Sequence, residues 1–273
     1  MKRLATALVV AAGMATLGAC SGDTGAITTP TGPLAYTRFV DAVPDSGKMD
    51  WRFVDVIENS PTAFGLNFRE SFPGATYQAT GPGARHLRVF QTSTDIAQTQ
   101  KVLFDTTFNF TAGTHYTLLV AGNMRSGLGK LYILTDDFTD PGAQIAVRFV
   151  NAGAGTVDLY ASAKGDTAAL PGVLVPGLAD FASTKYMTMP VGPLDLRAFA
   201  AGSTTFPAMA DVLAPAGFPA DRANDLTAVG GSAQAGSVLT AFIVPKSVTG
   251  SQAASFAKPG VIFIVDKHPA SGF

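Results

Sequence analysis

The sequence has one cysteine and few charged residues. Cys20 is the only cysteine among 273 residues, so a disulfide within the chain is excluded. Charged residues make up 14% of the chain, against ~25% in an average globular protein, and the formal net charge is −1. Intrinsic disorder, which needs low hydrophobicity and high net charge, is excluded by this composition. The absence of basic runs predicts no nucleic-acid partner.

Glutamate is nearly absent, and so are long apolar runs. Only Glu58 and Glu70 are glutamates among the 20 acidic residues. Glu favours helix interiors and Asp favours turns and caps, so the sequence predicts little surface helix. The longest apolar run after the N-terminal region is residues 261–265, which is far shorter than the ~20 residues of a membrane-spanning helix.

The first twenty residues have the layout of a secretory signal peptide. Lys2 and Arg3 form a basic start, and residues 4–19 are apolar with small residues at the end. The stretch ends in Leu17-Gly18-Ala19-Cys20, which resembles the lipobox of bacterial lipoproteins. The resemblance implies a signal peptide over residues 1–19, cleavage before Cys20, and lipidation of its thiol and new amine. The alternative is an ordinary secretory peptide with an incidental cysteine at the cut.

The predicted anchor makes a membrane the first expected partner. Several acyl chains hold a protein stably at a bilayer, whereas one does not. Ser21 follows Cys20 where an Asp would retain a lipoprotein at the inner membrane, so the resemblance implies the outer membrane of a two-membrane cell envelope. Residues 20–33 are small, polar and broken by proline, which is typical of a flexible tether.

An internal repeat follows the tether. Arg38-Phe39-Val40 recurs as Arg148-Phe149-Val150, an offset of 110 residues (148 − 38), and later matches keep the same order. A unit of this length exceeds solenoid repeats and has the size of an independent domain. The other matches are Asp50 with Asp158, Tyr77 with Tyr186, Gly83 with Gly192, Leu87–Phe90 with Leu196–Phe199, Ala112-Gly113 with Ala235-Gly236, Thr117 with Thr240, and Asp136 with Asp266.

Both units consist of short runs rich in β-branched and aromatic residues, separated by Gly, Pro, Asp or Asn. Such runs predict strands. In the first unit they are residues 35–40, 48–55, 85–91, 102–110, 114–121 and 130–135. In the second unit they are residues 145–150, 157–161, 184–189, 194–200, 237–244 and 261–266. Alternation places Trp51 on one face with Met49 and Phe53, which favours a core position over a sugar-stacking platform.

Short strands at regular spacing predict an all-β fold of two tandem antiparallel β-sandwich domains. The expected boundaries are residues 34–140 and 141–273, joined by an exposed connection over residues 134–144. A loop insertion of about residues 207–234 belongs to the second domain, with one helical turn around residues 221–225. Each unit is long enough to form its own core.

Several of these features are similar to the bacterial domain-of-unknown-function family numbered 4397. The similarity covers residues 34–137 well and residues 145–267 less well. It implies an immunoglobulin-like sandwich that occurs in tandem on exported, often lipid-anchored chains, and it transfers no catalytic residues. The matching features are Arg38-Phe39-Val40, the turn Asp41–Asp45, the Tyr77–Gly83 strand entry, the Ala112–Thr117 hairpin and Leu134–Asp137.

Residues that could carry chemistry are few and scattered. His86, His115 and His268 have no second histidine at ligand spacing, so ordinary structural histidines are expected. Glu58 and Glu70 do not form a glycosidase-type pair. None of the HExxH, GxSxG, GxxxxGK[ST] and GxGxxG motifs occurs, and no cofactor is predicted.

The densest acidic patch is Asp136, Asp137 and Asp140. Oxygen ligands at this spacing could hold calcium at a domain junction. However, EF-hand spacing is missing, and Lys267 stands in the second unit where Asp137 stands in the first. We therefore interpret this stretch as an interdomain linker, with calcium binding as the alternative.

Two function classes remain open at this point. The first is a non-catalytic binding scaffold, anchored in the envelope, whose loops recognise an envelope protein or a polysaccharide. The second is a carbohydrate-acting or metal-dependent hydrolase whose site converges only in the fold. Candidate residues do not correspond across the repeat (His86 with Asp195, His115 with Val238), so we expect no enzyme.

Overall fold

The computed structural model describes residues 32–55, 62–74, 76–99, 101–162, 170, 172–205 and 208–270. Contacts divide the chain into residues 1–33 and one compact unit, residues 34–273. The predicted signal peptide, Cys20 and most of the tether lie outside the described residues. In the part that is described, no helix has the length and apolarity needed to cross a membrane.

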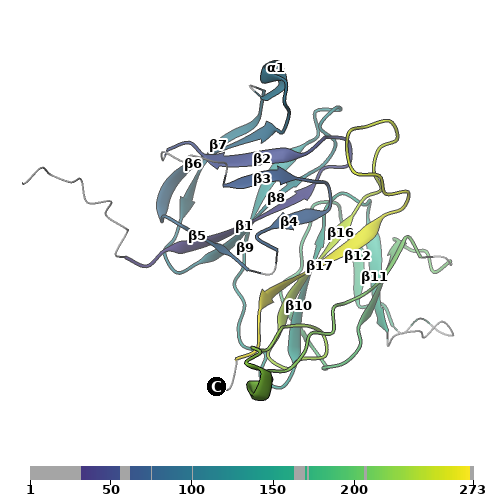
Figure 1. The fold of residues 1–273 in the computed structure, drawn as a ribbon. Helices are drawn as coiled ribbons and strands as arrows, with labels where there is room; N and C mark the ends of the chain where they lie inside the picture. The colour runs from purple at the N-terminus through teal and green to yellow at the C-terminus, as the bar shows by residue number, and fades with distance from the viewer. Residues whose placement is uncertain are drawn as a thin grey trace, which may run out of the picture. The chain divides into compact units, whose positions relative to one another are not determined.

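The first half of the compact unit forms two sheets (Figure 1). One sheet has the order β4-β1-β8-β9, with β5 also paired to β1, and the other has the order β3-β2-β6-β7. The elements are β1 (Ala35–Ala42), β2 (Met49–Phe53), β3 (Ala63–Leu66), β4 (Glu70–Phe72), β5 (Gln78–Thr80), β6 (Gly83–Gln91), α1 (Ile96–Thr99), β7 (Val102–Phe110), β8 (His115–Ala121) and β9 (Lys130–Thr135).

The second half repeats this topology. Its sheets have the orders β13-β10-β16-β17 and β12-β11-β14-β15. β13 pairs with β10 where β5 pairs with β1, and an isolated bridge between Val150 and Ser183 stands in place of the pairing of β4 with β1. The elements are β10 (Ile145–Asn151), β11 (Val157–Ser162), β12 (Val175–Leu178), β13 (Met187–Met189), β14 (Asp195–Ala200), β15 (Ala210–Leu213), the 3-10 turn η1 (Arg222–Asn224), β16 (Val238–Val244) and β17 (Gly260–Lys267).

The prediction of an all-β fold is confirmed, and each of the twelve predicted strands is present. The turn η1 also lies in the segment predicted to form a helical turn. Five strands were not predicted: β3, β4, β5, β12 and β15. Each has three or four residues, too few for an alternating pattern to be recognised.

The sheets are rich in antiparallel pairs, as predicted, and each half also has one parallel pair. β1 pairs parallel with β8, in a register that places Arg38 opposite Thr117. β10 pairs parallel with β16, and Arg148 lies opposite Thr240. Parallel strands are usually buried on both faces, and β10 and β16 are buried along their whole length.

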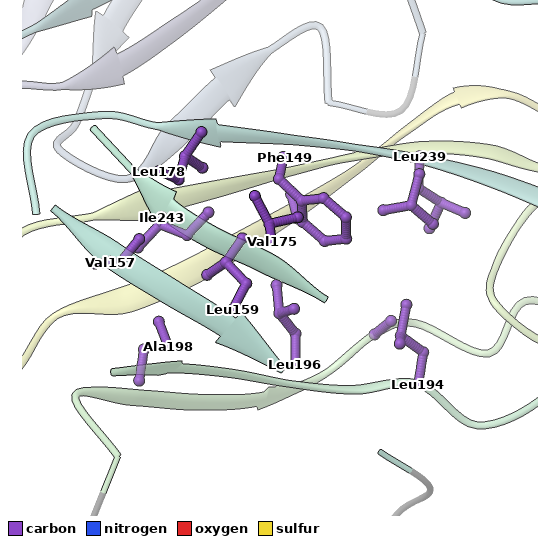
Figure 2. Packing of buried hydrophobic residues seen from close by; sticks show 14 of the residues in the cluster. Phe149, Val157, Leu159, Val175, Leu178, Leu194, Leu196, Ala198, Leu239 and Ile243 are labelled. Atoms are coloured by element: carbon purple, nitrogen blue, oxygen red, sulfur yellow. The ribbon is translucent and has the colours of Figure 1, made fainter. Parts of the chain in front are cut away.

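Each half has its own hydrophobic core between its two sheets. In the first half Trp51 is fully buried, and its ring lies 5.1 Å from that of Phe39, which confirms the core interpretation of this tryptophan. In the second half Phe149 packs among aliphatic side chains from both sheets, including Val175 and Leu196 (Figure 2). Alternate residues of β1 and β10 therefore point into separate cores.

A third apolar cluster joins the halves. The remaining alternate residues of the two sheets that contain β1 and β10 pack against one another, so these sheets are covered on both faces. The compact unit thus has four sheet layers, with the two mixed sheets in the middle. The buried members are Val40, Ala42, Leu119, Ala121, Val150, Ala152, Phe242, Val244 and Ile264.

Candidate functional site

The two mixed sheets, which contain β1 and β10, are called the central sheets below. The side chains between them change from polar to apolar along the strands. On β1, Arg38 is followed at alternate positions by Val40 and Ala42, and Pro44 comes next. On β16 the corresponding series is Thr240, Phe242, Val244 and Lys246. Because alternate residues of a strand share a face, the same face carries a polar network, the apolar cluster and finally a cleft. Among the described residues of this face, the network and the cleft are the two regions that carry polar groups.

The interface network consists of two arginines, two aspartates, two tyrosines and two threonines. Arg38 of the first half pairs with Asp266 of the second at 2.5 Å. Arg148 of the second half pairs with Asp136 of the first at 2.6 Å. The pairing is therefore reciprocal across an approximate two-fold relation between the halves.

Hydroxyl donors complete the network. Tyr77 donates to Asp136 at 2.8 Å, and Tyr186 donates to Asp266 at 3.0 Å. Thr117 and Thr240 each donate to the aspartate of their own half at 2.6 Å. Four of the matched pairs of the repeat meet here: Arg38 with Arg148, Tyr77 with Tyr186, Thr117 with Thr240, and Asp136 with Asp266.

The charges of the network compensate one another. Burial by itself would lower the pKa of Arg38, but the carboxylates of Asp266 and Asp136 outweigh burial and raise that pKa above its ordinary value. Burial and the neighbouring carboxylates raise the pKa of both Tyr77 and Tyr186, so the two phenols stay protonated donors. Two arginines against two aspartates leave no net charge, which is the condition for burying ions at tolerable cost.

The structure does not bring the three residues of the candidate calcium patch, Asp136, Asp137 and Asp140, together. Asp136 is 4% exposed and faces Arg148, Thr117 and Tyr77. Asp137 and Asp140 are exposed, and Asp140 accepts from the Gly142 N–H and pairs with Lys267 at 3.3 Å. The connection over residues 134–144, which was predicted to be exposed, is therefore buried at Asp136, because this carboxylate belongs to the interface network. Among the described residues, no three His, Cys, Asp or Glu side chains are grouped as a metal site.

The three histidines lie in separate environments. His86, on β6, pairs with Asp105 of β7, which also accepts from Arg88. His115 stacks on Tyr36 with ring centroids 4.6 Å apart, and burial lowers its pKa. His268 accepts from the Gly230 N–H at 2.8 Å through Nδ1. Each histidine has a local structural partner, and the fold does not assemble them.

An open cleft of about 710 Å³ lies beyond the apolar cluster. The segments that follow β1, β8, β10 and β16 line it, so it stands at the carboxyl ends of the four central strands. The connection after β12 contributes one further wall. Its lining includes Pro44, Leu128, Lys130, Phe181, Lys246 and Val248. Nothing in the sequence indicated this site, because its residues come from five separate connections.

Phe181 is held in the cleft wall by an unusual backbone conformation. Its φ angle is +62°, in the left-handed region that side chains rarely adopt. The ring stacks on Tyr132 of the other half, with centroids 5.4 Å apart and planes at 10°. Gly153 leaves room for it, since a Cβ there would lie 3.1 Å from the ring. The cleft therefore has a fixed aromatic surface.

In the first half Arg69 takes the position that Phe181 has in the second, and its side chain also contacts the other half. Arg69 has a φ angle of +71°, and its N–H donates to the carbonyl of Asp41, whereas in the second half the N–H of Asn151 donates to the carbonyl of Ala182. The Arg69 guanidinium donates to the carbonyls of Pro245 and Lys258 and lies 4.2 Å above the ring of Phe256. It fixes the connection between β16 and β17, which forms one side of the cleft.

Comparison with known proteins shows a resemblance over part of the chain. The model of the domain of unknown function DUF4397 matches residues 35–160, from β1 into β11. The comparison with curated proteins finds no match to the chain. The similarity expected over residues 34–137 is thus confirmed, and the match continues into the first two strands of the second half. Residues 35–160 resemble the domain of unknown function DUF4397.

Proposed function

We propose that this chain is a lipid-anchored cell-envelope protein that acts as a non-catalytic binding scaffold, with the cleft as its recognition surface. The cleft is the single observation that carries the proposal. It is concave, its lining surface is mainly apolar, and it is built from connections on a rigid β framework.

The position of the cleft suits an anchored protein. The compact unit begins at Leu34, directly before the amino end of β1, whereas the cleft stands at the carboxyl end of that strand. A strand of eight residues spans about 26 Å at ~3.3 Å per residue. An anchor at Cys20 would therefore reach the compact unit at the end of β1 opposite the cleft. Ser21 after Cys20 supports an outer-membrane location for this anchor.

The polar groups of the interface network support binding rather than catalysis. Its acids and bases are paired with one another and enclosed between the central sheets. The alternative, a carbohydrate-acting or metal-dependent hydrolase, needs carboxylates or histidines that converge at an accessible place. In the described ranges, His86, His115 and His268 are each engaged separately, so no observation favours that alternative.

A photo-crosslinking experiment in intact cells tests the proposal. A crosslinking amino acid is placed at Leu128, which lines the cleft and is 63% exposed, and at Ile96 of α1, which is 71% exposed and lies outside the cleft. We expect a discrete envelope adduct from position 128 and none from position 96. Equal labelling from both positions, or none from 128, would reject the cleft as the recognition surface.

The anchor and the absence of catalysis are tested separately. Cys20→Ser is expected to abolish lipidation and the partitioning of the protein into detergent, and an unmodified intact mass of the wild-type chain would refute the anchor.

The purified full chain, assayed against ester, glycoside, peptide and phosphoester substrates with and without calcium or zinc, is expected to show no turnover above buffer. Turnover that His86→Ala or His115→Ala abolished would favour the hydrolase instead.

A further inference from the structure

The cleft gathers exposed apolar side chains. Leu128 is 63% exposed, Phe181 37% and Val248 36%, and all three line the same hollow. Single exposed apolar residues are ordinary on a protein surface, whereas a group of them in one concavity marks an interaction site. The stacking of Phe181 on Tyr132 holds its ring in place before any ligand arrives, which reduces the entropy lost on binding.

Two lysines in the same cleft have no ion-pair partner among the described side chains. Lys130 and Lys246 are both exposed, and neither has a described carboxylate within the 4.0 Å that defines an ion pair. The cleft carboxylate, Asp180, accepts instead from the Gly155 N–H at 2.7 Å. The cleft thus has an excess of positive charge on a chain whose formal net charge is −1.

We propose, on the basis of the binding function above, that the cleft takes a short acidic segment of a partner protein. A bulky apolar side chain of this segment contacts Leu128, Phe181 and Val248. Carboxylates on neighbouring residues of the segment pair with Lys130 and Lys246. Apolar anchors supply most of the affinity at such sites, and complementary charge supplies selectivity and speed of association.

The openness of the cleft favours a peptide over a small molecule. Sites for small ligands enclose most of the ligand surface. Here most of the lining residues, including Lys130, Phe181 and Lys246, are exposed to solvent. An extended segment can run through such an open hollow and place alternate side chains against its walls.

Selection from a random hexapeptide display library tests the composition of the ligand. The target is the full chain in detergent micelles, as wild type and as Phe181→Ala and Lys246→Glu. We expect the wild type to enrich peptides that combine Asp or Glu with Phe, Leu, Ile or Trp, and both variants to lose this enrichment. Enriched basic peptides, no enrichment, or unchanged enrichment by the variants would each overturn the proposal.

The affinity of a selected peptide for each variant then separates the apolar contact at Phe181 from the charged contact at Lys246. Fluorescence anisotropy is expected to show binding that is about tenfold weaker for Phe181→Ala and roughly threefold weaker for Lys246→Ala. Only Phe181→Ala should keep the full dependence on salt. Matched controls outside the cleft are Phe218→Ala, at a side chain 46% exposed, and Lys185→Ala, at an exposed lysine. Thermal unfolding followed by circular dichroism verifies that all variants are folded, and equal losses in the controls would contradict the assignment.

The peptide proposal and the scaffold proposal can fail separately. Dodecanoate is added as a small amphipathic anion: if it binds in the cleft while no peptide does, the site is one for small molecules and the peptide proposal is wrong. If no peptide is selected but the probe at position 128 still captures an envelope partner, the scaffold function stands without the acidic segment. If both experiments fail, the scaffold function fails as well.

Discussion

The two halves of the compact unit share one strand order but use the same positions differently. At the interface network they are reciprocal, since each half supplies an arginine, an aspartate, a tyrosine and a threonine. At the cleft they diverge: Arg69 holds a connection by its carbonyls, whereas Phe181 at the corresponding corner presents a ring to the hollow. The charged and hydroxyl positions of the interface network are repeated, whereas the corner positions Arg69 and Phe181, which also contact the other half, are not.

The largest expected effect comes from breaking the reciprocal network. Arg38→Met removes the cation that pairs with Asp266 and leaves this carboxylate buried with hydroxyl donors alone. Loss of one partner of a buried ion pair costs about 3–5 kcal/mol. Urea unfolding of the full chain measures the loss.

The same substitution in the other half sharpens the comparison. Arg148→Met should cost less than Arg38→Met, because Asp136 still has Arg38 at 3.6 Å after Arg148 is removed. The exposed Arg125 serves as a control, and Arg125→Met is expected to change the free energy of unfolding by less than about 0.5 kcal/mol. If Arg148→Met proved the more damaging of the two, this account of the asymmetry would be wrong.

An intermediate effect is expected where an aspartate of the first half corresponds to an asparagine of the second. Asp41 is 1% exposed, its Oδ1 accepts from the Val43 N–H at 2.8 Å, and its Oδ2 has no hydrogen-bond partner among the described atoms. Burial raises the pKa of this carboxyl well above its ordinary value. A folded-state pKa above the unfolded one gives stability that is present at acid pH and lost as pH rises through the folded value.

Asp41→Asn should therefore stabilise the protein at pH 7–8 by about 1–3 kcal/mol and have little effect near pH 4. Stability curves over pH 4–8 measure the difference. The reverse change, Asn151→Asp, should destabilise, because the Asn151 amide donates to the carbonyls of Gly155 and Leu178. A gain for Asp41→Asn that did not depend on pH would contradict the role assigned to burial of this carboxyl.

The smallest expected effect concerns His115, whose counterpart is Val238. Burial lowers the pKa of His115, and Arg38 lowers it further, while Asp136 and Asp266 act in the opposite direction. The unfolded chain binds a proton more readily, so stability falls as pH drops through the ordinary value of ~6.5. His115→Val should flatten the stability curve between pH 7 and pH 5.5, and thermal unfolding at several pH values measures it. An unchanged slope would show that this imidazole does not contribute to acid sensitivity.

The sequence by itself determined the strands, the repeat and the all-β class. Alternation along residues such as Met49, Trp51 and Phe53 is local, and turn residues bound each strand. Five short strands were not predicted, because an alternating pattern cannot be recognised over three or four residues. The repeated Arg, Tyr and Asp positions were visible as well, but their purpose was not.

Tertiary structure alone decided which strands pair and what the repeated residues do. A strand pattern does not specify its neighbour, so the parallel pairing of β1 with β8 could not be read from the sequence. Asp136 could be interpreted as a calcium ligand until the second half placed Arg148 beside it. The cleft likewise exists only because five connections, distant along the chain, end at one place when the two central sheets pack face to face.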